Sequence, residues 1–195
     1  MHNVITLAHN TPSCTSLPNG WLQVSFTLNM PFTLEIGARL CMGMIRLAPW
    51  RIDGQHIACL ALPSEIEPDL SQAIRLERQG ISLMYIEPNQ PLLITGEGLA
   101  IADVLLAAQH IKHYASHCLI LLSSDAFPCV IKPARFMVAD LPDLIAACPL
   151  LDDWGFANRL VSTTGLAGCF EGKLSQLVER MIIKNQLHYS DVDNV

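Results

Sequence analysis

Two glycines set between an apolar run and an amphipathic segment are the residues of this chain best suited to bind a ligand. The segment 91–108 reads PLLITGEGLAIADVLLAA, and Gly96 and Gly98 in it give the backbone unusual freedom. The residues that follow are apolar at helical spacing, so a strand, a turn and a helix are predicted. The first amides and the dipole of such a helix favour an anion. The expected contacts of a nucleotide phosphate are Thr95, Gly96, Glu97 and Gly98. A tight strand–helix connection without a ligand explains the pattern equally well.

A second cluster of small and hydroxyl-bearing residues follows another predicted strand. The segment 163–172 reads TTGLAGCFEG, and its hydroxyl groups suit a ribose or a phosphate. It is predicted to line the same crevice as the first turn, and a simple connection is the alternative. The residues expected at the ligand are Thr163, Thr164, Gly165 and Cys169. No histidine or acid is placed by sequence to activate Cys169 as a nucleophile, and no catalytic residue is identified.

Other reactive residue types give weaker signals. His110, His113 and His117 share one helical face at a spacing that permits a metal, but a polar helix face explains them more simply. Asp152 and Asp153 are adjacent, so their side chains diverge and are expected in solvent. The seven cysteines form no C-x-x-C pair and are expected mostly as small buried hydrophobic residues. No metal site is predicted.

The first half of the chain is predicted to be β-rich. Apolar and polar residues alternate with period two, and turn signals recur at short intervals, as in a small antiparallel barrel or sandwich. The expected strands are Trp21–Asn29, Phe32–Ile36, Arg39–Met44, His56–Leu62, Ala73–Leu76 and Ile81–Ile86. The patterning changes at Pro88–Asn89, so we expect a β-barrel domain over residues 1–88 and an α/β domain over 89–195.

In the second half, strands and helices are expected to alternate. This order predicts a parallel sheet covered by helices on both faces, with the ligand beyond the carboxyl ends of the strands. The expected strands are Leu92–Ile94, Cys118–Leu122 and Arg159–Ser162, and Arg135–Val138 is expected as a strand or a loop. The expected helices are Ile101–Tyr114, Leu144–Trp154 and Lys173–Lys184.

The composition limits the classes of function. The chain has 195 residues, 51% of them hydrophobic, which is enough for a sizeable core without disulfides. Only 15% are charged and the net charge is −6, unlike a nucleic-acid-binding protein. No apolar stretch approaches the about 20 residues of a membrane span, and the N-terminus has no signal-peptide pattern. We therefore expect a cytoplasmic protein that binds a small ligand or a protein partner.

The glycine turn and the later segment VSTTGLAGCFEGKLSQLVERM together resemble the nucleotide-binding domain of the ferredoxin–NADP reductase superfamily. The electron-transfer subunit of dihydroorotate dehydrogenase is the most similar member. The resemblance implies a flavin-binding barrel followed by an NAD(P)-binding domain, and it covers about the last 105 residues well. It also implies that Lys132 and Arg135 contact the phosphate of the cofactor.

The chain departs from that family in three places. The flavin signature Arg-x-Tyr/Phe-Ser/Thr is absent, which makes FAD binding doubtful. Glu97 and Asp103 place carboxylates at the turn, where each would repel a phosphate by about 1 kcal/mol in water. The cysteine cluster that binds an iron–sulfur centre near the C-terminus is also missing.

Three functions are consistent with these observations. The first is electron transfer between NAD(P)H and FAD, serving a protein redox partner. The second is a non-catalytic relative that has lost its cofactor sites and acts as an interaction or regulatory module. The third is a nucleotide sensor without flavin, which needs only the glycine turn.

Overall fold

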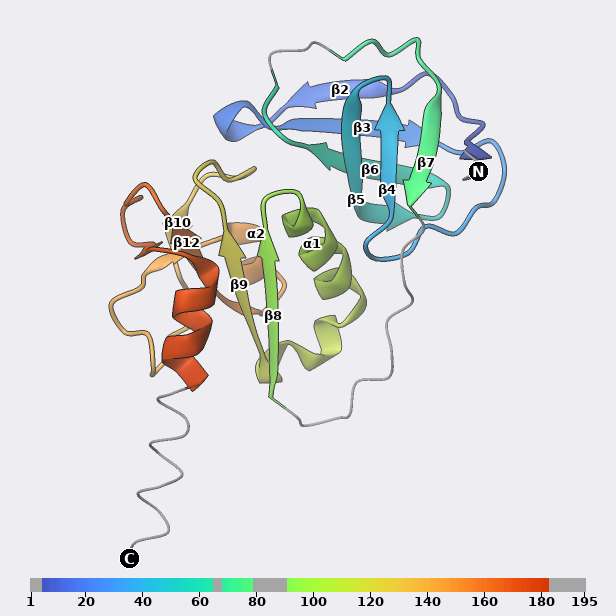
Figure 1. Ribbon diagram of the computed structural model, residues 1–195. Coiled ribbons are helices and arrows are strands. Elements are labelled where there is room, and N and C mark those ends of the chain that lie inside the picture. The colour runs from blue at the N-terminus through green and yellow to red at the C-terminus, as the bar shows by residue number, and fades with distance from the viewer. Residues whose placement is uncertain (1–4, 65–67, 79–90, 183–195) are drawn as a thin grey trace, which may run out of the picture.

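The first half of the chain forms a curved antiparallel sheet. The computed structural model describes residues 5–64, 68–78 and 91–182 (Figure 1). The sheet has seven strands in the order β1-β7-β4-β5-β6-β3-β2. These strands are β1 (Ile5–Thr6), β2 (Ser13–Ser16), β3 (Leu22–Thr27), β4 (Arg39–Met42), β5 (Ile45–Asp53), β6 (His56–Ala61) and β7 (Ile74–Arg78). The chain between β1 and β2 crosses from one edge to the other, because the Leu7 amide donates to Ile74 and the Asn10 amide donates to Thr27.

The interior of this barrel is built by alternation along its strands. In β3, Val24 and Phe26 are buried while the residues between them are partly exposed. They pack with Leu40, Ile57 and Ile74 from neighbouring strands in one hydrophobic core. The period-two pattern therefore predicted the buried face of β3 correctly.

The second half is a parallel sheet of four strands in the order β13-β12-β9-β8. Its strands are β8 (Leu92–Glu97), β9 (Cys118–Ser123), β12 (Ala157–Ser162) and β13 (Phe170–Glu171). The helices are α1 (Ala100–His110), α2 (Pro149–Asp153) and a final helix over residues 174–182. Two short 3-10 helices, Pro18–Gly20 and Lys112–His117, and a hairpin of β10 (Lys132–Pro133) with β11 (Ala146–Ala147) complete the described elements.

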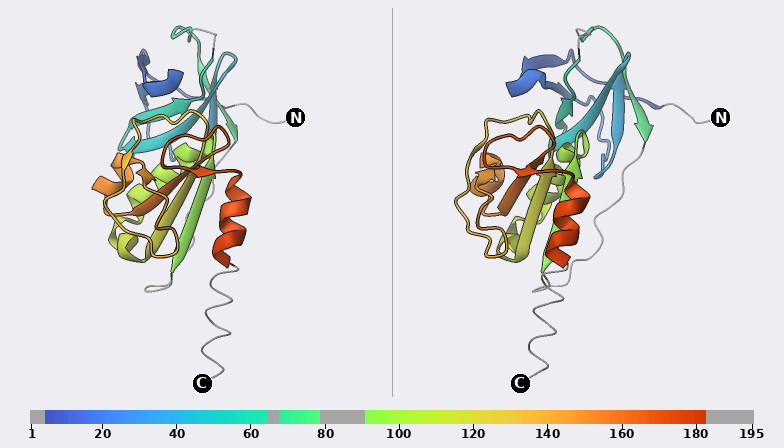
Figure 2. Two further views of the ribbon diagram at one scale, coloured as in Figure 1. Left: turned by 90° about the vertical axis from the view of Figure 1, so that its left-hand side faces the viewer. Right: turned by 60° about the vertical axis from the view of Figure 1, so that its left-hand side comes forward.

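Helices cover both faces of the parallel sheet, as predicted. Within β9, Ile120 and Leu122 lie in the core shared with α1. Leu121, which points the other way, packs with Leu177 and Met181 of the final helix. Figure 2 shows this helix on the side of the sheet opposite α1.

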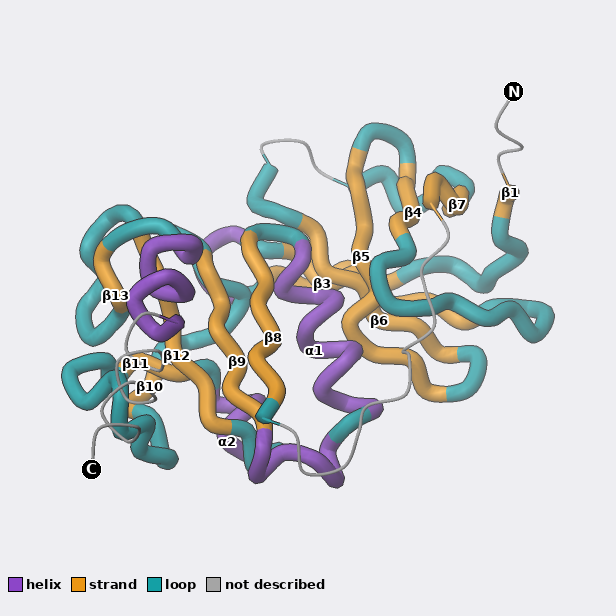
Figure 3. Tube along the Cα trace, turned by 60° about the horizontal axis from the view of Figure 1, so that its bottom comes forward, coloured by secondary structure: helices purple, strands orange, loops and turns teal. Residues whose placement is uncertain are grey.

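The two sheets are packed against each other through α1. Figure 3 shows α1 between the strand pair β8–β9 and the barrel strands β5 and β6. Trp21, Ala48 and Leu60 of the barrel belong to the same core as Ile101 and other residues of α1. The Trp21 indole also donates a hydrogen bond to the Ala126 carbonyl at 2.6 Å.

Several expected elements differ from those observed. Phe32–Ile36 is not a strand, because only Ile36 forms a bridge to another segment and the alternation of the other residues reflects side-chain burial. The strand β5 was missed because Pro49 lies inside it. The register shifts between Pro49 and Arg51, and this irregularity lets the strand include a proline, which has no amide hydrogen to donate.

Differences also occur after β9. The expected helix Leu144–Trp154 contains strand β11 and becomes helical only at Pro149, whereas Arg135–Val138, expected as a strand or a loop, is a loop. The expected strand Ile81–Ile86 and the domain boundary at Pro88–Asn89 lie outside the described residues. No helix of the described residues is long and apolar enough to cross a membrane.

Candidate functional site

The glycine turn after β8 is explained first by packing. A Cβ on Gly96 would lie 2.6 Å from Cγ2 of Val104 and 3.0 Å from the Ala100 carbonyl oxygen, so a glycine is needed where the strand meets α1. Gly98 has φ +55° and open space around it, and its amide donates to the Ser123 carbonyl at 3.0 Å. Gly98 is therefore free of crowding at the position of a Cβ, whereas Gly96 is packed against α1.

The side chain of Asp103 is engaged with the barrel and does not act at the turn. Its two carboxylate oxygens accept hydrogen bonds from the Arg39 guanidinium at 2.7 and 2.5 Å. The Gly37 amide donates to the same carboxylate at 3.0 Å. The expectation that Asp103 repels a phosphate is wrong for this reason, because its charge is balanced by Arg39.

Asp125 organises the second turn. Its carboxylate accepts the Thr163 amide and hydroxyl, both at 2.7 Å, and the Ser162 hydroxyl at 2.8 Å. These hydrogen bonds, the Thr163 hydroxyl first, lower the pKa of Asp125. The Thr164 hydroxyl lies 3.0 Å from that of Ser162. The hydroxyl groups expected to meet a ribose or a phosphate are thus already bonded within the protein.

The structure brings only some of the expected ligand residues together. Thr95 and Glu97 are exposed on β8, and Thr163, Thr164 and Gly165 follow β12 at the same end of the sheet. Lys132 is exposed on β10, and the Arg135 guanidinium lies 3.1 Å from Asp153 in an exposed ion pair.

Cys169 belongs to the interior more than to the crevice. Burial raises the pKa of its thiol. The backbone of the neighbouring Gly168 is held in place, because its carbonyl accepts hydrogen bonds from the amides of both Ile145 and Ala146.

Acidic side chains lie at the carboxyl end of the parallel sheet. Glu97 ends β8, Asp125 follows β9, and the Glu171 carboxylate would lie 3.7 Å from a Cβ on Gly165. None of these three carboxylates forms an ion pair with another described residue. Because like charges repel, this end of the sheet is poorly matched to a pyrophosphate.

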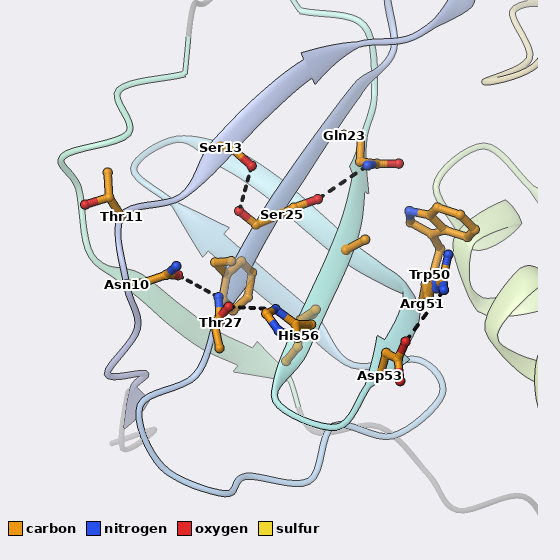
Figure 4. A pocket seen from close by; sticks show the side chains of 13 residues that line it. Asn10, Thr11, Ser13, Gln23, Ser25, Thr27, Trp50, Arg51, Asp53 and His56 are labelled. Carbon is orange, nitrogen blue, oxygen red and sulfur yellow. Dashed lines mark hydrogen bonds and ion pairs between the residues drawn. The ribbon is translucent and has the colours of Figure 1, made fainter.

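A polar hollow lies on the outer face of the barrel. Its volume is about 520 Å³, and Figure 4 shows polar side chains of β2, β3, β5 and β6 converging on it. The Thr27 hydroxyl lies 2.8 Å from Nδ1 of His56, and the Arg51 guanidinium lies 3.6 Å from Asp53. We call this hollow the barrel groove. Its principal polar and aromatic residues are Asn10, Ser25, Thr27, Trp50, Arg51 and His56.

Trp50 stands where the barrel groove meets the interior. Its indole Nε1 is buried, and no described group accepts a hydrogen bond from it. Trp50 and Gln23 line both the groove and a smaller cavity of about 150 Å³ between the two sheets. In Figure 4 the indole nitrogen lies on the side of the ring that faces Gln23.

The barrel groove combines an aromatic side chain with hydroxyl groups and a guanidinium. Trp50 offers an aromatic face and an unpartnered donor, Thr27 and Ser25 carry hydroxyl groups, and Arg51 supplies a positive charge beside Asp53. Sequence reasoning missed the groove, because its residues come from four strands and form no motif. The only sequence signal was the polar face of β3.

Comparison with known proteins gives matches in structure only. No family model and no curated protein sequence matches this chain. The cytochrome P450 reductase GcoB from Amycolatopsis is 11% identical with a TM-score of 0.54, covering 83% of this chain and 53% of the reductase. The ferredoxin reductase of carbazole 1,9a-dioxygenase is 10% identical with a TM-score of 0.58, covering 90% and 56%.

A third structure matches over more of its own length. The flavohem-like FAD/NAD-binding domain of nitric oxide dioxygenase from Vibrio cholerae is 6% identical with a TM-score of 0.56, covering 86% of this chain and 79% of that domain. The chain thus spans about half of the two reductases and most of this domain. The resemblance in sequence is confirmed at the level of the fold: the chain has the fold of the ferredoxin reductase-type FAD/NAD-binding domains.

Proposed function

We propose that this protein is a flavin-dependent electron-transfer protein that holds a flavin nucleotide such as FAD in the barrel groove. The observation that carries the proposal is the buried indole Nε1 of Trp50, which lacks a partner at the wall of the groove. A buried donor without an acceptor costs about 1–3 kcal/mol, so a ligand that accepts this hydrogen bond is favoured. The fold shared with reductase domains supports the same class of ligand.

Different residues of the groove would bind different parts of the flavin nucleotide. The Trp50 ring would pack against the flavin ring system, and the hydroxyls of Ser25 and Thr27 would bond its polyhydroxy chain. Arg51, which lies 3.6 Å from Asp53, would turn its guanidinium to the phosphate, and His56 would offer a ring nitrogen to it. Flavin, when bound, supplies reversible acceptance of one or two electrons.

The protein around Trp50 would also exclude water. Trp50 packs against the core that contains Ile101 and Leu105 of α1. A ring seated beside it would therefore be covered on one side by the junction of the two sheets. Low local polarity strengthens hydrogen bonds to a buried ring and prevents loss of electrons to solvent species.

A second candidate is the interaction or regulatory module without cofactors. The acidic crevice favours it, because Glu97, Asp125 and Glu171 oppose the phosphates of NAD(P)H. In that case the protein would bind its partner without any cofactor. A redox or regulatory partner and NAD(P)H as electron donor both remain predictions.

Flavin titration tests the proposal directly. We expect the purified protein to bind FAD or FMN, with quenching of flavin fluorescence and an increase in melting temperature. Trp50→Leu should weaken binding by about 2- to 10-fold, the equivalent of about 0.5–1.5 kcal/mol for an aromatic stacking contact. Thr15→Ala, an exposed β2 residue outside the groove, is the matched control and should bind normally.

The outcomes separate the candidates. Binding that Trp50→Leu weakens and Thr15→Ala does not supports the flavin site. Binding that is indifferent to Trp50 places the flavin elsewhere and overturns the site. No response to flavin or to NAD(P)H leaves the module as the function.

A further inference from the structure

Two cysteines that are distant in sequence meet beside the small cavity between the sheets. Cys129 lies in the loop after β9 and Cys148 directly precedes α2, 19 residues later, yet their sulfur atoms are 3.7 Å apart. Both line the cavity of about 150 Å³, together with Trp50 and Phe127. Joining the sulfurs requires an approach from 3.7 Å to about 2.05 Å, which small side-chain rotations can supply.

The two thiols are chemically unequal. The Cys129 thiol donates to the Cys148 sulfur, and this hydrogen bond lowers the pKa of Cys148, with a smaller contribution from the amides of Leu151 and Leu150. The same hydrogen bond, together with burial, raises the pKa of Cys129. Of the two thiols Cys148 therefore has the lower pKa, although burial opposes the shift, and Cys129 is positioned as its resolving partner.

The other cysteines lack this arrangement. Burial raises the pKa of Cys118 to about 11 and also raises that of Cys59. Neither of them has a cysteine neighbour among the described hydrogen bonds. Thiolate chemistry is therefore expected to be selective for Cys148.

We propose that Cys129 and Cys148 form a peroxide-reactive dithiol that closes to a disulfide across the cavity between the two sheets. A cavity of about 150 Å³ excludes bulky oxidants but admits hydrogen peroxide, which is little larger than a water molecule with its share of about 30 Å³. The cavity and the barrel groove share the lining residues Gln23 and Trp50.

The reaction balances in two steps. The Cys148 thiolate attacks one oxygen of hydrogen peroxide, the O–O bond breaks, and the leaving hydroxide takes a proton from solvent, which leaves a sulfenic acid. The Cys129 sulfur then attacks the Cys148 sulfur, the S–O bond breaks, and the hydroxide leaves with the Cys129 proton as water. Two thiols are oxidised and one peroxide is reduced to two waters. An external thiol reductant reverses the change by exchange.

The disulfide would act on the contact between the sheets. The loop that ends at Cys129 carries the carbonyls of Ala126 and Phe127, which accept hydrogen bonds from Trp21 and from Asn19 of the barrel, the latter at 2.9 Å. Tying this loop to the start of α2 would stiffen the junction, so we expect the oxidised protein to resist unfolding better than the reduced one.

The test uses the whole protein without added flavin. Reduced protein is treated with hydrogen peroxide, thiols are blocked at intervals, and peptides are mapped by mass spectrometry without reduction. We expect loss of two hydrogen atoms and one linked peptide pair, Cys129 with Cys148, at a rate at least about 10-fold above oxidation of Cys118 in the same molecules.

Variants assign the roles. Cys129→Ser should leave a sulfenic acid on Cys148 that dimedone traps, and Cys148→Ser should abolish the rapid phase. Cys14→Ser, a half-buried cysteine of β2, is the matched control and should form the disulfide normally. Equal oxidation rates for Cys148 and Cys118 in the unaltered protein, or a disulfide between other cysteines, would overturn the proposal whether or not flavin binds.

Discussion

Replacing Gly96 by alanine tests whether the glycine turn exists for packing or for a ligand. The new Cβ would lie 2.6 Å from Cγ2 of Val104, whereas ordinary contacts are 3.4–4 Å, so strand and helix must separate by several tenths of an ångström or more. Val104 is buried at 3% exposure and has a short, stiff side chain that cannot move aside. Overpacking of this kind costs about 1–3 kcal/mol. We therefore expect Gly96→Ala to destabilise the protein by that amount in the absence of any ligand.

A second substitution measures the contact itself. Val104→Ala removes two buried methyl groups and should cost about 1.5–2.5 kcal/mol alone. In the double variant the two alanines share the space, so the combined loss should be smaller than the sum by about 1–2 kcal/mol. The Ala100 carbonyl, 3.0 Å from the new Cβ, prevents a complete rescue.

Urea unfolding at constant m-value is the assay, and Gly98→Ala is the matched control. Gly98 has open space but φ +55°, so an alanine there should cost about 1–2 kcal/mol through backbone strain that Val104→Ala does not relieve. Strict additivity of Gly96→Ala with Val104→Ala, or a neutral Gly96→Ala, would show that the packing explanation is wrong.

Two further predictions concern charged groups. Asp103→Asn should destabilise the protein by about 1–3 kcal/mol, between the values for exposed and buried ion pairs, because both side chains of the pair with Arg39 are only 17% exposed. In the Arg39→Met background Asp103→Asn should cost much less, and equal losses in urea unfolding would refute the coupling. Asp125 has a lowered pKa, so its contribution is present above the unfolded value of about 4 and is lost as pH falls through the folded value. The stability difference between the unaltered protein and Asp125→Asn should therefore be constant above about pH 5 and shrink as the pH falls below about 4, and a difference that does not change on acidification would contradict the role of the carboxylate.

The sequence predicted the order of the principal elements of both halves. Period two marked the buried face of β3, and helical spacing marked α1, because these patterns report which side chains leave water. The same patterns were wrong at Phe32–Ile36 and silent on β5, since burial alone does not specify a backbone partner and a bulge at Pro49 hides a strand.

The candidate site was predictable only in part. The first turn was predicted at both Gly96 and Gly98, but Gly96 lies inside β8 and only Gly98 follows that strand. The later turn at Thr163 was located correctly after β12, at the same end of the sheet. The carboxylate that accepts hydrogen bonds from Thr163 was not predicted, because Asp125 lies 38 residues away and follows a different strand. The barrel groove was missed for the same reason.

By itself, the sequence determined the most regular elements, such as β3 and α1, and which of their faces are buried, because those properties follow from local spacing and hydrophobicity. Only the tertiary structure decided the long-range partners. Asp103 pairs with Arg39, which is 64 residues away in the sequence. Asp125 accepts hydrogen bonds from Ser162 and Thr163. Cys129 contacts Cys148. These contacts depend on strand order and on how the two sheets pack, and no local pattern of residues encodes either.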